Sequence, residues 1–143
     1  MAQNSGTTGV FVNLYRSPLR VVFRRRVDFR WDRYDVFKPW EKIDAVVMVI
    51  EELAKENPAF TEKLIAVDEK HYRASSHRTR HYVHKDRDQL YGTNRKDLAE
   101  KFSRKVAGVW LGTNLNSQAM LQVIKEACEA AEVDYGTLSS LKW

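Results

Sequence analysis

The chain has 143 residues, 43% of them hydrophobic, and a formal net charge of +5. This content supports a buried core and excludes a chain that is disordered throughout, while the excess of positive charge favours an anionic partner. The single Cys128 excludes an internal disulfide framework and paired-cysteine zinc sites, and no apolar run approaches the roughly 18 residues that span a bilayer.

The N-terminal quarter combines arginine with aromatic rings. Residues 1–13 are small and polar and predict a flexible lead, without the basic and apolar regions of a secretory signal. The stretch RVVFRRRVDFRWDRY follows at residues 20–34. Its periodicity is mixed, because arginines four residues apart favour a helical face whereas alternation around Phe29 favours a strand. We expect an extended arm, residues 1–38, that contains one or two short helices and needs a partner surface to fold.

Four amphipathic segments follow Pro39. The sequence predicts helices over residues 40–56 and 59–73, a third that begins at Asn94 and ends at Gly112 as a left-handed cap, and a fourth that begins at Asn116. A polar, basic connection separates the second helix from the third. The predicted fold is therefore all-α, with an arginine-rich arm followed by a four-helix bundle in a domain of residues 39–143.

Positive charge is confined to two blocks of the chain. Residues 1–37 carry seven arginines against three aspartates, and residues 70–87 carry six lysines or arginines against one aspartate. Arginine matches phosphate with two parallel hydrogen bonds and stacks on rings, so both blocks predict contacts with nucleic acid. The predicted contacts are Arg16, Arg20, Arg24, Arg25, Arg26, Arg30, Arg33, Arg73, Arg78, Arg80, Lys85 and Arg87.

The remaining reactive side chains do not form a convincing active site. His77, His81 and His84 would align on a helix and hold a metal ion, but the basic residues between them would repel a cation; we expect them to extend the basic surface. Cys128 lies on an apolar stripe and is expected to be a buried thiol. No glycine-rich phosphate loop is present. We therefore expect no enzyme activity, no cofactor and no metal.

The arm, LYRSPLRVVFRRRVDFRWDRY, together with the bundle predicted for residues 40–133, resembles the major coat proteins of filamentous and rod-shaped archaeal viruses. The resemblance covers nearly the whole chain but is architectural and includes no short diagnostic motif. It implies that the arm wraps double-stranded DNA, held in the A form inside a helical filament. It also implies pairing with itself or with a related coat protein, and location in the virion after assembly in the host cytoplasm.

The expected function is thus that of a structural nucleoprotein that packages double-stranded DNA independently of sequence. Two alternatives remain open: a small DNA- or RNA-binding regulator or chromatin-type protein, and a metal-dependent nuclease built on the histidines. Trp31 and Tyr34 fit base stacking and packing against another subunit equally well.

Overall fold

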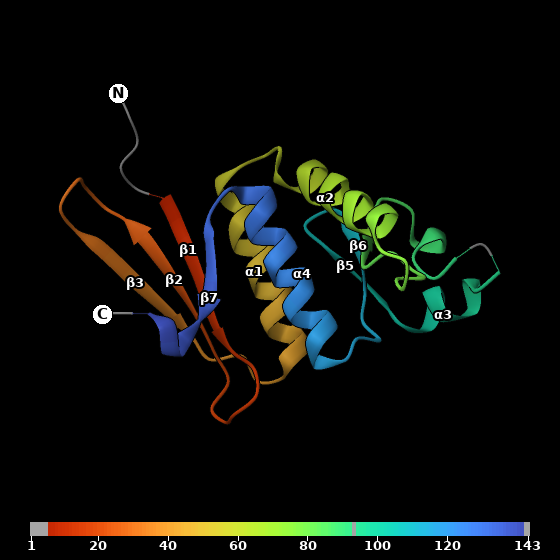
Figure 1. Cartoon of the computed structure of the whole chain (residues 1–143), viewed down its shortest axis with the longest axis horizontal. Coiled ribbons are helices and arrows are strands. Elements are labelled where there is room, and N and C mark those ends of the chain that lie inside the picture. The colour runs from red at the N-terminus through yellow and green to blue at the C-terminus, as the bar shows by residue number, and fades with distance from the viewer. Residues whose placement is uncertain (1–5, 93, 142–143) are drawn as a thin grey trace.

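The N-terminal segment forms most of a four-stranded sheet. The computed structural model describes residues 6–92 and 94–141. β1 (Gly6–Asn13), β2 (Arg20–Arg26) and β3 (Asp32–Phe37) make an antiparallel meander. β7 (Asp134–Thr137) pairs with β1 in parallel, which gives the order β3-β2-β1-β7. The sheet therefore joins segments from opposite ends of the chain (Figure 1).

Helices cover one face of this sheet. α1 (Lys42–Glu56) and α4 (Ser117–Ala131) lie against it, and α2 (Phe60–Ala74) packs beside α4 (Figure 1). We call the opposite side of the sheet the open face. Within the described residues, only the C-terminal turn η2 (Leu138–Ser140) lies against the open face. A side chain at Gly136 of β7 would point to this face, and Ser140 Oγ lies 2.9 Å from the position that its Cβ would take.

A second, smaller unit lies at the end of the molecule away from the sheet (Figure 1). β4 (Val83–His84), β6 (Val109–Gly112) and β5 (Ser103–Val106) pair in that spatial order, and the short helices η1 (Arg87–Gln89) and α3 (Lys96–Lys101) flank them. A small apolar cluster supports this unit and consists of Leu90, Tyr91 and Ala99.

One main core runs across the expected division at residue 38. The buried side chains of β1 and β2 and those of α1, α2 and α4 belong to a single cluster that includes Val10, Val21, Phe23, Ile50, Leu64 and Ile124. Phe23 is fully buried and meets Phe37 edge to face, with ring centroids 5.4 Å apart. Burial of such a ring contributes about 2–3 kcal/mol relative to exposure, so the N-terminal segment is part of the folded body.

The prediction of an all-α fold with a four-helix bundle is wrong, and so is the helical arm. The alternation noted around Phe29 belongs to a strand hairpin, and residues 6–13, expected to be a flexible lead, are β1. β-branched residues recur through β1 at Thr7, Thr8, Val10 and Val12, which is typical of a strand. Residues 1–5 of the expected lead lie outside the described part of the chain.

The third predicted helix is also wrong over most of its length. α3 ends at Lys101, and the apolar residues beyond it form the β5–β6 hairpin. Ala107 and Gly108 make its two-residue turn with φ of 51° and 90°, the backbone that tight hairpins require. Gly112 ends a strand and is not a helix cap; its N–H donates to Tyr82 O at 2.9 Å.

The other three helices are confirmed within two or three residues of their predicted ends. The side chain of Asn116 caps α4 by accepting a hydrogen bond from Ala119 N at 2.8 Å. Cys128 is buried on the inner face of α4, as predicted, and burial raises the pKa of its thiol to about 12.

Candidate nucleic-acid interface

The loop between β2 and β3 presents large rings to solvent. Phe29 is 73% exposed and Trp31 is 64% exposed, and the guanidinium carbon of Arg30 lies 5.1 Å from the Phe29 ring centroid. The hairpin extends away from the helical layer (Figure 1). Soluble proteins rarely leave such apolar groups together in water unless the patch binds something, so this hairpin tip, residues 26–33, is the strongest candidate for an interaction site.

Asp28 holds the hairpin tip in shape. Its Oδ1 accepts hydrogen bonds from the backbone N–H groups of Arg30 at 2.7 Å and Trp31 at 2.9 Å, and Val27 N donates to Trp31 O at 3.1 Å. An aspartate that bonds the backbone two and three residues ahead fixes a turn. The backbone that carries the rings is therefore fixed in advance, which lowers the backbone entropy lost when they contact a partner.

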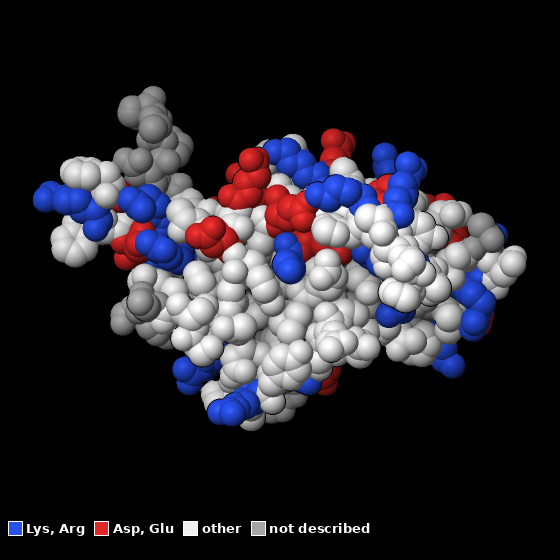
Figure 2. All heavy atoms as spheres, viewed as in Figure 1, with Lys and Arg blue, Asp and Glu red and all other residues white. Residues whose placement is uncertain are grey.

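The open face continues the basic surface along β2. Arg20, Arg24 and Arg26 alternate with inward residues and share this face with Asp32 of β3. Asp32 pairs with Arg24 at 2.8 Å and with Arg26 at 3.1 Å, so one carboxylate serves two guanidinium groups and a positive charge is left over. Figure 2 shows Lys and Arg, with some Asp or Glu among them, at this end of the molecule; further Lys and Arg lie over α2 and the smaller unit, and the lower part of the surface over α4 is largely uncharged.

Arg25 points to the opposite side of the sheet and is a structural residue. Its guanidinium contacts Asp35 at 2.7 Å, Glu52 at 3.1 Å and Glu56 at 2.7 Å, and only 11% of its side chain is exposed. These contacts fasten β2 and β3 to α1. Strand alternation thus separates three consecutive arginines, because Arg24 and Arg26 face outward while Arg25 is turned toward carboxylates.

We predict that Glu56 contributes to acid lability through this cluster. Burial alone would raise the pKa of Glu56, but hydrogen bonds from Thr7 and Arg25 outweigh it and hold the pKa below its ordinary value of 4.5. A lowered folded pKa stabilises the fold above pH 4.5, and this contribution is lost as pH falls through the folded pKa.

Glu56→Gln should therefore reduce the free energy of unfolding by about 1–2 kcal/mol at pH 7 and flatten its decline below pH 4.5, measured by urea denaturation at several pH values. Glu51→Gln, an exposed change five residues earlier on the same helix, is the control. Equal pH profiles for the two variants would contradict the prediction.

The second basic block is mostly neutralised inside the molecule. Arg78 is buried and pairs with Asp68 and with Glu126 at 3.0 Å, Arg73 pairs with Glu69, and Arg87 lies near Asp88 and Glu100. Arg80 donates to Asn114 O and lies over the rings of Tyr82 and Tyr91. The block is basic in sequence, but most of its charge serves the fold.

The three predicted histidines are not aligned on a helix, because residues 75–90 form loops, β4 and η1. His81 Nδ1 lies 3.0 Å from Asp68 Oδ2, and its ring stacks on Tyr72 with centroids 4.1 Å apart. His81 therefore belongs to the buried network of Asp68, Arg78 and Glu126, whereas His77 is exposed. In the described residues no group of three or more His, Cys, Asp or Glu side chains is arranged to hold a metal ion.

Of the twelve predicted contacts, seven are within 4 Å of a carboxylate in the described parts of the chain. The five for which no such carboxylate is found there are Arg16, Arg20, Arg30, Arg80 and Lys85. Three of these five lie on β2 or on the loops at its two ends. The available arginines therefore concentrate around the N-terminal hairpins.

Sequence reasoning missed the residues that organise this surface. Asp28 and Asp32 were counted only as acids that reduce the net charge, yet one shapes the hairpin tip and the other positions two arginines. The available signal was the pattern of two alternating runs separated by a short segment with an aspartate, which is typical of a hairpin.

Comparison with protein-family models found no matching model, and searches of the curated proteins and of the solved structures found no match. Within the described part of the chain, no helix combines the length and the apolar character needed to cross a membrane. The bundle and the unfolded arm on which the coat-protein resemblance was based are both replaced by other structure.

Proposed function

We propose that the protein binds single-stranded nucleic acid independently of sequence, with the hairpin tip and the open face as its interface. This develops the second expectation from the sequence, a sequence-tolerant DNA- or RNA-binding protein. The observation that carries it is the pair of exposed rings, Phe29 and Trp31, on a turn whose backbone Asp28 fixes and which also carries Arg26, Arg30 and Arg33.

Two physical features favour an unpaired strand over a duplex. Every base has a flat face that stacks on a ring, but the faces are accessible only when the base is unpaired. Arg20 and Arg26 lie six residues apart on β2, about 20 Å at 3.3 Å per residue, so they offer a row of cations parallel to the strand. The row can follow a phosphate backbone while the rings receive bases at its end.

Wrapping of a duplex by an extended arm finds no support in this arrangement, because the arm is folded into the sheet and Arg25 and Arg78 are occupied internally. A protein partner for the hairpin tip is the main competing use. The three arginines of the tip exceed its two aspartates by one positive charge, and guanidinium groups match phosphate, which together favour a polyanion.

The test is fluorescence anisotropy with labelled 12-nucleotide strands of unrelated sequence and with the matching duplex. We expect the single-stranded oligonucleotides to bind about tenfold or more tightly than the duplex, and their affinities to lie within about tenfold of one another. The logarithm of the affinity should fall linearly with the logarithm of the salt concentration. A thousandfold spread between unrelated strands would indicate base-specific reading, and no salt dependence would exclude the proposed phosphate contacts.

A further inference from the structure

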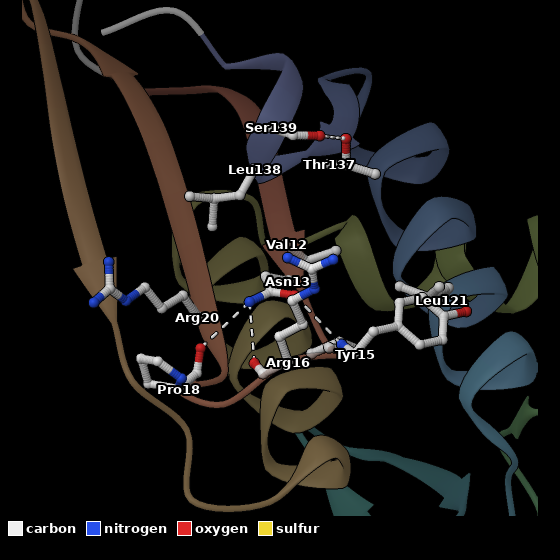
Figure 3. Close-up of a pocket in the computed structure, with 11 residues that line it drawn as sticks. Val12, Asn13, Tyr15, Arg16, Pro18, Arg20, Leu121, Thr137, Leu138 and Ser139 are labelled. Carbon is white, nitrogen blue, oxygen red and sulfur yellow. Dashed lines mark hydrogen bonds between the residues drawn. The ribbon is translucent and has the colours of Figure 1, made fainter.

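A cleft opens at the other end of β2 from the hairpin tip. It lies at the carboxyl ends of the parallel strands β1 and β7, between the β1–β2 loop, Leu121 of α4 and the C-terminal turn, and has a volume of about 640 Å³ (Figure 3). Clefts of about 300–1,000 Å³ accommodate small organic ligands. Neither the hairpin tip nor the buried network around Arg78 contributes to it.

The charged residues that line the cleft are both arginines. Arg16 extends from the loop toward the C-terminal turn, whereas Arg20 extends away from Arg16, toward β3 (Figure 3). No carboxylate lines the cleft, and none lies within 4 Å of either guanidinium among the described residues. Arg20 Nε is buried without a hydrogen-bond partner in that same part of the chain. Arg16 is therefore the guanidinium that can receive an anion beside the C-terminal turn, through charge-assisted hydrogen bonds.

The remaining walls suit a flat organic group carrying hydroxyls. Val12, Leu121 and Leu138 supply apolar surface, and the Tyr15 ring, 63% exposed, stands at the edge. The hydroxyls of Thr137 and Ser139 lie 3.0 Å apart on the C-terminal side and can bond a sugar or phosphate.

Asn13 holds the loop that carries Tyr15 and Arg16. Its Nδ2 donates to Arg16 O at 3.1 Å and to Pro18 O at 3.4 Å, and its Oδ1 accepts from Tyr15 N at 3.4 Å (Figure 3). One amide thus fixes three successive parts of the loop. The backbone that carries the ring and the guanidinium is therefore held in place before a ligand arrives.

We infer that this cleft binds one nucleoside phosphate, with the phosphate on Arg16 and the hydroxyls of the C-terminal turn and the base against Tyr15 and the apolar wall. The ligand class rests in part on the proposed function, because Arg20 begins the row of arginines that leads along β2 to the hairpin tip. The nucleotide is either free or one unit of the bound strand, and both sources present the same chemistry.

The test is calorimetric titration of the full chain with AMP, adenosine and inorganic phosphate. AMP should bind at least about tenfold more tightly than adenosine, because the Arg16 guanidinium receives its phosphate. Arg16→Gln should weaken AMP about tenfold, and Lys63→Gln, an exposed single-charge change on α2, should leave AMP binding unchanged. AMP binding no tighter than adenosine binding, or equal effects of the two substitutions, would overturn the inference.

Competition identifies the source of the nucleotide. If the cleft receives a unit of the strand, AMP should displace a labelled 12-nucleotide strand and Arg16→Gln should weaken that strand; if it takes a free nucleotide, both should bind together. Either outcome supports the cleft. Phe29→Ser should weaken the strand but leave AMP affinity unchanged. Absence of strand binding by the unchanged protein, with AMP binding intact, would contradict only the proposed function.

Discussion

Replacing both Phe29 and Trp31 by serine should reduce the affinity for single strands by about a hundredfold while leaving stability unchanged. Each stacked base is worth about 1–3 kcal/mol, so two lost rings remove enough binding energy for that effect. Both rings are exposed and lie outside the buried clusters, so their removal leaves the core intact. Anisotropy titrations at fixed salt measure the affinity, and urea unfolding should show a change within about 0.5 kcal/mol.

Trp40→Ser is the matched control for this variant. Trp40 is 91% exposed, more than either tip residue, but it lies between β3 and α1 and not in the hairpin tip. Its loss should leave strand affinity within about twofold of the unchanged protein. If Trp40→Ser weakens binding as much as the double substitution, general exposure of rings and not the hairpin would explain the interaction.

Replacement of Arg78 by methionine should produce the largest loss of stability in the chain, about 3–5 kcal/mol. Asp68 and Glu126 would then remain buried on facing helices without the guanidinium that lies between them. Arg78 also lies 3.8 Å from the Tyr82 ring centroid and donates to Arg80 O at 3.0 Å, so the loop before β4 would lose its attachment as well. Urea denaturation at pH 7 measures the loss.

The loss should also depend on pH. Burial already raises the pKa of Glu126, opposed by the Gln122 hydrogen bond and the Arg78 charge. Without Arg78 the pKa of Glu126 should rise further. An acid whose pKa is raised in the folded state makes the fold more stable at low pH, and this stability is lost as the pH rises through the folded pKa. The variant should therefore lose less stability at pH 5 than at pH 7.

Arg73→Met is the control, because it removes only an exposed pair with Glu69, and it should change stability by at most about 0.5 kcal/mol. A similarly small effect at Arg78 would contradict a structural role for the network.

The two substitutions separate properties that sequence composition places together. Arg78 and Arg30 were both counted as phosphate contacts because each lies in a basic block. The structure shows one of them between two buried carboxylates and the other beside an exposed ring. Net charge per segment cannot distinguish them, because the neutralising acids lie outside the basic block: Asp68 on α2, just before it, and Glu126 on α4, 48 residues beyond Arg78.

The predicted helices that were right share a strong local signal. α1, α2 and α4 each carry apolar residues at helical spacing over four turns, and caps such as Asn116 mark their ends. The strands were missed because their evidence is non-local: β1 is stabilised by β2 on one side and by β7, more than a hundred residues later, on the other. In the β5–β6 segment, Val106, Val109 and Trp110 fit a helical spacing as well as a hairpin, and Gly108 in the turn decides between them.

By itself the sequence determined the three long helices, the burial of Cys128 and the gathering of arginine with aromatic rings near the N-terminus, since each depends on neighbours within a few residues. Only the tertiary structure decided which arginines are available to a ligand. In a strand successive side chains point to opposite faces, so Arg24 and Arg26 reach the open face while Arg25 meets Glu52 and Glu56 of α1. That choice follows from which face of the sheet the helices cover, and no local pattern contains it.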